Sequence, residues 1–168
     1  LADELSMSKS GLFGLFGSKE ELQAATFRAA VEHFTDEVWR PVARQEPGMP
    51  RLLALVDRWL GYHRRRALPG GCFVTTATIE FDARPGPLRD AVADARRRMH
   101  AALEADIRTA VAAGDLPADT KPADLAFALY ALASAASVAI QLEEPGAHAR
   151  ARRCMRALLA ANVPEHRA

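Results

Sequence analysis

Apolar residues recur at intervals of three or four along most of this sequence, a spacing typical of the buried face of an α-helix. The longest regular case begins at Pro87 and ends at Gly114, with a helix-starting proline and a helix-ending glycine. Its apolar positions are Leu88, Val92, Ala95, Met99, Leu103, Ile107 and Val111. Similar patterns cover residues 19–39, 50–63, 123–142 and 151–159. The sequence therefore predicts an all-α fold.

The segment Cys72–Asp82 has a different local pattern. It is rich in β-branched residues in an alternating arrangement, which favours a strand when the segment is considered alone. A lone strand among helices would leave its backbone N–H and C=O groups without partners. We therefore predict a buried helix here. A carboxylate at Glu80, between Ile79 and Phe81, would then need a cationic ligand or an arginine as partner, the alternative being an exposed or capped acid.

The composition is that of a folded soluble protein. Hydrophobic residues make up 49% of the 168 residues and charged residues 26%, enough to bury a core. The longest apolar stretch, Leu125–Leu142, contains polar residues and lies between polar segments, which favours a buried helix over a membrane span. Two cysteines, Cys72 and Cys154, are too few for a disulfide framework and have no metal-ligand spacing. We expect reduced thiols in the cytoplasm, no metal and no cofactor.

A catalytic site is not evident in the sequence. Cys72 and His63 are a thiol and an imidazole, but no third group that would orient them and no oxyanion-binding device can be identified. No metal-binding cluster or phosphate-binding loop is apparent either. We therefore do not expect an enzyme.

The first two dozen residues have the layout of a helix-turn-helix. Residues 1–5 are interpreted as the end of a helix, followed by a turn, and Ser8 can cap a short second helix that Gly17 ends. Ser18 and Glu21 then form a capping box at the start of a long helix, which Pro41 would end or kink. In this motif the N-terminal end of the second helix enters the major groove of DNA.

Eight residues of this region are predicted to contact DNA. Small or basic side chains suit the groove, a glycine permits close approach, and a lysine at a helix N-terminus suits a phosphate. These residues are Ser8, Lys9, Ser10, Gly11, Phe13, Gly14, Leu15 and Lys19. Two lysines against four acidic residues give residues 1–24 a net charge of −2. Binding would therefore depend on placed contacts, on dimer symmetry or on residues before Leu1.

Residues 1–22, LADELSMSKSGLFGLFGSKEEL, resemble the DNA-reading signature of TetR-family transcriptional regulators. That signature contains Val-Ser-Lys-Gly-Thr-Leu-Tyr, two variable residues, Phe, and a helix that starts with Ser-Lys-Glu. The turn at residues 70–72 and the loop at residues 114–117 also resemble those of family members. The resemblance implies a nine-helix fold whose first helix and part of its second precede Leu1. It also implies a ligand-binding body and a dimer interface made by the last two helices.

The resemblance has three departures that bear on DNA contact. Phe13 stands where the family usually has a tyrosine whose hydroxyl binds phosphate. Ser6 replaces the usual turn glycine, and Leu15 stands where a polar aromatic residue is common. Leu15 would then touch a thymine methyl group or pack against the protein.

We divide the chain into a partial helix-turn-helix domain, residues 1–24, and a ligand-binding and dimerisation domain, residues 25–168. The predicted helix at residues 123–142 is apolar nearly all round, so both of its sides must be covered. Its many alanines permit close helix approach, and with the last helix it would form a four-helix interface in a homodimer. The alternative is the core of a monomer.

A ligand pocket is predicted among the middle helices, where apolar and polar side chains share helix faces. Its candidate residues are Trp59, Tyr62, His63, Phe73, Thr76, Glu80, Met99, Leu103 and Phe127, each of which is also compatible with core packing.

The predicted function is ligand-gated repression. A small apolar or amphipathic effector would shift the helix that begins at Lys19 and release the homodimer from double-stranded operator DNA. No membrane partner is expected. The alternative is a helical small-molecule-binding or interaction protein with a degenerate DNA reader.

Overall fold

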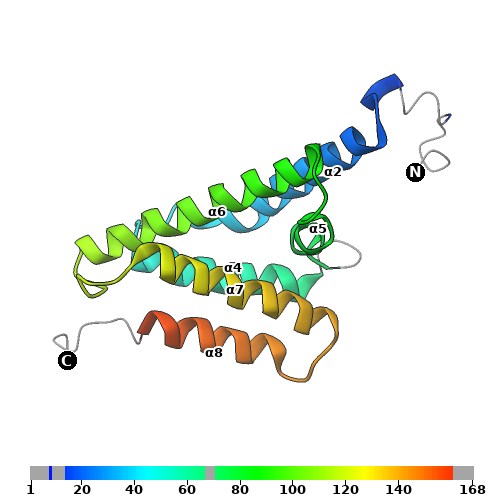
Figure 1. Cartoon of the computed structure of the whole chain (residues 1–168). Helices are drawn as coiled ribbons and strands as arrows, with labels where there is room; N and C mark the ends of the chain where they lie inside the picture. Colours follow the sequence, from blue (N-terminus) through cyan, green and yellow to red (C-terminus); the bar gives the residue numbers. More distant parts are fainter. Residues whose placement is uncertain (1–7, 9–13, 67–70, 161–168) are drawn as a thin grey trace.

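The computed structural model describes residues 8, 14–66 and 71–160, and all regular secondary structure in these ranges is helical. The all-α prediction is therefore confirmed. Residues 14–16 form a short helical stretch before the longer elements (Figure 1). The longer elements are α2 (Lys19–Phe34), η1 (Thr35–Trp39), α3 (Arg40–Val42), α4 (Met49–Arg65), α5 (Phe73–Phe81), α6 (Pro87–Ala112), α7 (Pro122–Gln141) and α8 (Ala147–Ala160).

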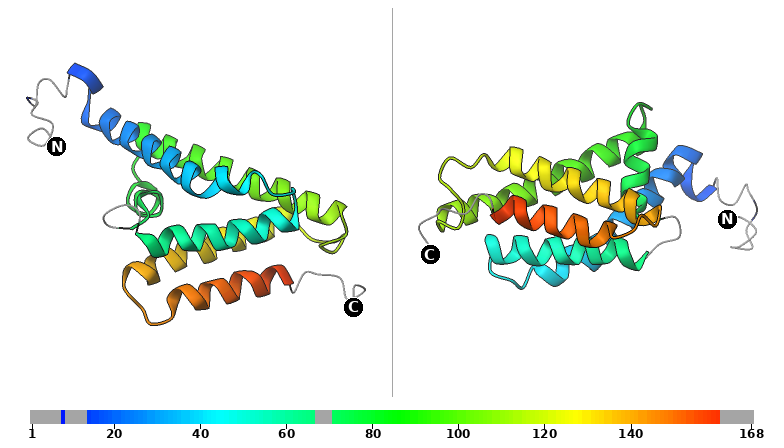
Figure 2. Two further views of the ribbon diagram at one scale, coloured as in Figure 1. Left: turned by 180° about the vertical axis from the view of Figure 1, so that it is seen from behind. Right: turned by 90° about the horizontal axis from the view of Figure 1, so that it is seen from below.

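The helices are arranged in three layers. Helices α2 and α6 lie side by side in one layer, α4 and α7 form the middle layer, and α8 covers the far side (Figures 1 and 2). The short helix α5 lies across one end and contacts both α2 and α6. The first turns of α2 project beyond this end, and the 14–16 stretch continues outward from them (Figure 1). This arrangement places the N-terminal segment away from the main core.

The start of α2 has one half of the predicted capping box, whereas the Ser18 backbone N–H donates to the Phe16 carbonyl and not to the Glu21 side chain. The Ser18 side chain accepts a hydrogen bond from the Glu21 backbone N–H at 3.0 Å, and Ser18 itself has the extended backbone of an N-cap. Gly17, with φ of +73°, separates the two helical segments in a conformation that glycine adopts without strain. The predicted position of this helix start is confirmed.

The far end of the long helix differs from the prediction. The helix passes through Pro41 to Val42, and the distortion lies before the proline, in the π-helical turn η1. There the Arg40 backbone N–H donates to the Thr35 carbonyl, five residues back. Pro41 has no N–H for the Glu37 carbonyl four residues back, and the Arg58 Nε of α4 donates to that carbonyl at 2.7 Å instead.

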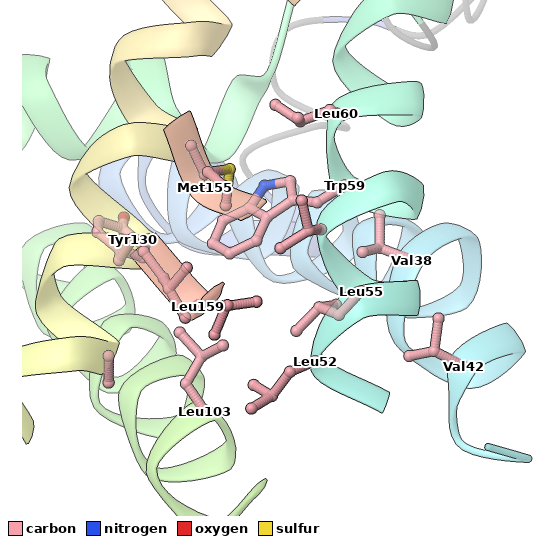
Figure 3. Packing of buried hydrophobic residues seen from close by; sticks show 14 of the residues in the cluster. Val38, Val42, Leu52, Leu55, Trp59, Leu60, Leu103, Tyr130, Met155 and Leu159 are labelled. Carbon is pink, nitrogen blue, oxygen red and sulfur yellow. The ribbon is translucent and has the colours of Figure 1, made fainter. Parts of the chain in front are cut away.

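Helices α4, α6, α7 and α8 enclose the main hydrophobic core, which Figure 3 shows at close range. Rings and aliphatic side chains interlock there, with Trp59 edge-on to both Phe34 and Tyr130 at centroid distances of 5.8 Å and 6.0 Å. The labelled members are Val38, Val42, Leu52, Leu55, Trp59, Leu60, Leu103, Tyr130, Met155 and Leu159. A second cluster joins α2, α5 and α6 around Phe27, Ala77 and Leu88.

The segment with the strand-like pattern is a helix, as predicted, but it is not a buried one. In α5 only Ala77 is buried, whereas Phe73 is 38% exposed and Ile79 is 64% exposed. The Thr76 and Thr78 hydroxyls donate to the carbonyls of Cys72 and Val74. These bonds accommodate β-branched residues within the helix. The prediction of burial was wrong because α5 covers the end of the α2–α6 pair with one narrow face.

Helix α4 is fixed to α6 at its first turn. Gly48 has φ of +98°, and a Cβ there would lie 3.3 Å from the Ala110 backbone N, so this close approach requires glycine. The Gly48 N–H and the Arg51 guanidinium both donate to Oδ1 of the buried Asp106, each at 3.3 Å. Burial raises the pKa of Asp106, against the opposing effects of these two donors.

Helix α8 is tied to α4 by a charged cluster. Asp57 of α4 accepts hydrogen bonds from Arg152 at 2.7 Å and 3.0 Å, and from Arg156 at 2.6 Å and 3.4 Å. The Arg152 hydrogen bond is the main cause that lowers the pKa of Asp57 to about 2, with Arg156 acting in the same direction. Arg152 and Arg156 are one helical turn apart, so the carboxylate spans both positions.

We expect Asp57→Asn to lower the free energy of unfolding by about 1 kcal/mol at neutral pH. The effect is no larger because 38% of the Asp57 side chain is exposed, so solvent screens its ion pairs. The folded-state pKa lies below the ordinary 3.8, so the stabilisation is present above pH 3.8 and is lost as pH falls toward 2. Urea unfolding at neutral pH and at two salt concentrations measures it. Asp90→Asn is the control, because Asp90 is exposed and its contact to Arg89 is 4.0 Å long. Equal stability of both variants would contradict the role of the cluster.

Candidate functional site

The predicted DNA-contacting residues lie on the projecting N-terminal end as far as the structure describes them. Ser8, Gly14 and Lys19 are exposed, and the Leu15 side chain is 67% exposed. Leu15 therefore does not pack into the core. The other four predicted contacts, Lys9, Ser10, Gly11 and Phe13, lie outside the described residues.

Lys19 is the first residue of α2 and is therefore at a helix N-terminus. Backbone N–H groups in the first turn of a helix are free to bind an anion, and the helix dipole favours negative charge there. The Ser18 side chain uses one of them, the N–H of Glu21. Glu20 and Glu21 are exposed in the same turn, so a phosphate at Lys19 would have two carboxylates near it.

A cavity of about 290 Å³ lies where α2, η1, α5, α6 and α7 meet. Its wall is mostly apolar, and it includes residues of the helix that carries Lys19 at its other end. The lining residues are Val31, Phe34, Thr35, Trp39, Val74, Ala95, Arg96, Arg98, Met99, Ala102 and Tyr130. The size and the apolar lining with a few polar groups are typical of a small-molecule site.

The charged residues that line this cavity are both arginines. Arg96 is half-buried, and its guanidinium carbon lies 4.4 Å from the centroid of the Tyr130 ring. His100 packs near the same ring, with centroids 5.0 Å apart, and burial followed by the Arg96 charge lowers the pKa of His100. Across the described part of the chain, Arg96 forms no ion pair. Arg97, next to it, pairs with Asp94 on the exposed side of α6.

The predicted ligand-binding residues are spread over the core, the cavity and two surface grooves. Met99 lines the cavity. Trp59, Tyr62, His63 and Leu103 are buried in the main core. Thr76 and Glu80 line a groove between α5 and α7, Phe127 lines another beside α5 and α6, and Phe73 is partly exposed. Because Glu80 is exposed, it does not need the cationic partner that a buried carboxylate would require.

Arg96, Tyr130, Trp39 and Thr35 line the cavity but were not predicted as ligand-binding residues. Residues 96–98 are three consecutive arginines, and such a run is usually a solvated helix surface. The position of Arg96 in the helix could have indicated its role. It follows the buried Ala95 and precedes Met99 by three residues, so it borders the apolar face of α6.

Tyr62 and His63 are buried residues of α4, the first packed against Phe34 and the second near Trp59. Desolvation by burial lowers the pKa of His63 to about 4, and neither ring nitrogen has a hydrogen-bond partner in the described part of the structure. Burial also raises the pKa of Tyr62 to about 12. At neutral pH both side chains are therefore uncharged, which suits their positions between aromatic rings.

The outer face of α7 is uncovered in the single chain, although a helix that is apolar nearly all round was predicted to be covered on both sides. It carries large apolar side chains at 44% to 69% exposure, together with exposed alanines. These residues are Phe127, Ala131, Ala135, Val138 and Leu142. Alone among the described helices, α7 is also long and apolar enough to cross a membrane, but it contacts α4, α6 and α8 as a core helix does.

Helix α8 continues this exposed surface. Arg152 and Arg156 face Asp57 of α4, so Cys154 and Ala157, both exposed, lie toward the other flank of α8. Helices α7 and α8 lie side by side in both views (Figures 1 and 2). We call the exposed residues 127, 131, 135 and 138 of α7, its C-cap residue 142, and residues 154 and 157 of α8 together the α7–α8 face.

Known structures share this fold over nearly the whole chain. A TetR transcriptional regulator from Chloroflexus aurantiacus J-10-FL is 23% identical, with a TM-score of 0.87 over 96% of this chain and 82% of that one. A TetR-family regulator from Cytophaga hutchinsonii is 19% identical, with a TM-score of 0.80 over 98% and 82%. AibR, crystallised with isovaleryl coenzyme A and operator DNA, is 18% identical, with a TM-score of 0.71 over 92% and 81%. No curated protein matches the sequence significantly.

A family pattern described as "Tetracyclin repressor-like, C-terminal domain" matches residues 48–155, which is well over half of the chain. The matched residues run from the glycine before α4 to Met155 in α8, so they include most of the cavity wall and α7. Together with the fold, this match shows that the chain belongs to the TetR family of transcriptional regulators.

Proposed function

We propose that this protein is a cytoplasmic, homodimeric repressor that binds double-stranded operator DNA through residues 1–24 and leaves it when a small molecule occupies the cavity. The observation that carries the proposal is the shared helix. Residues Val31, Phe34 and Thr35 line the cavity on the same continuous helical segment that begins at Lys19. At a rise of 1.5 Å per residue, Lys19 lies about 23 Å from Phe34 along this axis.

The mechanism follows from the way α2 is held. Its N-terminal half packs on α5 and α6, and its C-terminal end joins η1, which α4 holds at Glu37. The Arg58 Nε donates to the Glu37 carbonyl, and the Arg65 guanidinium pairs with the Glu37 carboxylate at 3.0 Å. A ligand between α2 and α6 would push α2 aside against this fixed point. The displacement would grow along the helix toward Lys19 and change the separation of the two DNA-reading ends.

The homodimer is proposed from the α7–α8 face. A contiguous apolar surface of this kind is typical of an interface, and exposed alanines permit two helices to approach closely. Paired α7 and α8 helices would form a four-helix bundle about a two-fold axis. AibR was crystallised with both an acyl coenzyme A and operator DNA, so this fold is compatible with both partners.

Operator release by a cavity ligand tests the proposal. Fluorescence anisotropy with labelled DNA from beside the protein's own gene should show binding to a specific segment and release by compounds that bind the cavity. Met99→Trp, which fills the cavity, should bind the same DNA and lose the response to ligand. A protein that binds cavity ligands while its DNA affinity stays unchanged would refute ligand-gated repression.

We expect Lys19→Ala to weaken operator binding and to flatten its salt dependence by about one counterion per subunit, because an exposed lysine in the first turn of α2 would neutralise a phosphate bound there. Anisotropy titrations at several salt concentrations give the slope of log K against log salt. Lys121→Ala is the matched control, since Lys121 is also an exposed lysine at a helix start, that of α7. If the two variants have the same salt slope, Lys19 does not contact phosphate.

A further inference from the structure

The cavity of the proposed repressor is lined by positively charged side chains without any described negative one. Its charged lining residues are Arg96 and Arg98, and no described acidic residue lines it. Arg96 is half-buried, so part of its hydration is lost, and it forms no ion pair with any carboxylate in the described structure. Burial without a counterion is unfavourable for a guanidinium. The cavity therefore has a site at which an anion would lower the free energy.

The N–H donors of Arg96 have no hydrogen-bond partner among the described residues. The guanidinium carbon of Arg96 lies over the Tyr130 ring, 4.4 Å from its centroid, and a cation–π contact of this kind uses none of the guanidinium N–H donors. The N–H donors point outward in the plane of the guanidinium, where a carboxylate can accept two of them side by side. His100, on the same ring, is held toward its neutral form by burial and by Arg96, so it adds little positive charge.

The rest of the cavity suits an apolar body attached to that anionic group. Val31, Phe34, Val74 and Met99 form an apolar wall, and Trp39 adds an aromatic surface. Arg98, exposed at the edge of the cavity, adds a second positive charge to the field that an approaching anion meets. An amine would meet two positive charges instead. The exposed Glu80, the acid for which a cationic ligand was considered, lines a different groove.

From this arrangement we propose that the effector is an amphipathic monocarboxylate, with its carboxylate paired to Arg96 and its apolar chain against Phe34 and Met99. This inference deepens the proposed function, because it names the ligand class of the same cavity. It depends on the position of Arg96 rather than on the number of arginines in the run at residues 96–98.

The test compares three probes that share one chain and differ in the head group: octanoate, 1-octanol and octylammonium. Isothermal titration calorimetry on the full chain without DNA measures each affinity. Octanoate should bind about ten to a hundred times more tightly than 1-octanol, as a charge-assisted bidentate pair requires, and octylammonium should bind most weakly. Equal binding of octanoate and 1-octanol, tighter binding of octylammonium, or no binding of any of the three would overturn the proposal.

Variants assign the effect to one residue. Arg96→Met should remove the advantage of octanoate and keep the 1-octanol affinity within about twofold. Retained 1-octanol binding also shows that this variant is folded. Arg97→Met is the matched control, because Arg97 is the adjacent arginine and is already paired with Asp94. Equal loss of octanoate binding in both variants would contradict the assignment to Arg96, and the comparison of probes in the unmodified protein stands even if Arg96→Met does not fold.

The calorimetric result is separate from operator release. Arg96-dependent carboxylate binding without any change in DNA affinity would refute the repressor mechanism and leave the ligand class standing. If 1-octanol released the operator as readily as octanoate, the monocarboxylate ligand class would be refuted and the repressor mechanism would stand.

Discussion

An Ala135→Glu variant is expected to be a folded monomer that binds operator about a hundred to ten thousand times more weakly than the unmodified protein. Ala135 is exposed in the single subunit and lies in the middle of the α7–α8 face, so glutamate there is compatible with the folded chain. In a two-fold interface, however, each new carboxylate would be buried in an apolar surface and would lie near its copy. In a dimer, binding of one DNA-reading end holds the second end at a high effective concentration near the other half-site. A monomer has no second end and loses this gain in affinity.

Static light scattering at micromolar concentration and anisotropy with operator DNA measure the two effects. Ala105→Glu is the control, because Ala105 is also an exposed alanine in the interior of a long helix, but on α6. It should remain dimeric and bind DNA normally. An Ala135→Glu variant that stays dimeric would place the dimer interface elsewhere, and a monomer that keeps full operator affinity would show that DNA reading does not need two subunits.

The large loss of operator affinity expected for the monomer follows from the geometry of DNA. Two recognition helices must meet half-sites about 34 Å apart, and one subunit can occupy only one of them. The negative charge of residues 1–24 makes the second contact more important, since the segment does not attract DNA by its overall charge. In the proposed homodimer, small residues such as Ala131 and Ala135 would set how closely the two subunits approach, and therefore the separation of the two reading ends.

Helices α2 and α6 could be predicted from the sequence because each has both a periodic apolar face and a chemical boundary. Ser18 begins α2 with a side-chain cap, and Pro87 lies at the first turn of α6. The π-helical turn η1 could not be predicted, because it depends on a contact between distant residues. The carbonyl that Pro41 leaves without an N–H partner is bonded by Arg58, from a different helix.

The candidate cavity was predicted only in outline, for a similar reason. Met99 and Arg96 are three residues apart on one helix, but the sequence does not show that Arg96 reaches the Tyr130 ring of α7. Conversely, Trp59 and His63 have the amphipathic character that is typical of ligand contacts, but both are buried and pack against other side chains. Local sequence patterns identify which side chains face inward. Which neighbouring helix or cavity each of them contacts depends on the tertiary structure.

His63 is expected to make the protein sensitive to mild acid. The imidazole is 5% exposed and has no hydrogen-bond partner in the described residues, and desolvation lowers its pKa from 6.5 to about 4. The unfolded chain therefore takes up a proton near pH 6.5, whereas the folded chain does so only near pH 4. Stability is full above pH 6.5 and falls as pH decreases between these values, by about 3 kcal/mol in total.

His63→Leu should remove this loss, because leucine does not titrate and suits a site between Trp59 and Tyr62. Urea unfolding at a fixed protein concentration, repeated from pH 7 to pH 4, gives the free energy of unfolding of each protein. The pKa values of His100 and His148 are also lowered, so these groups add a slope of the same sign to both proteins, which cancels in the difference. Asp57 loses its ion pairs only below pH 3.8, outside this range. Parallel curves for the two proteins would show that His63 is hydrated or partnered in solution, and the core around Trp59 would then be more open than the structure indicates.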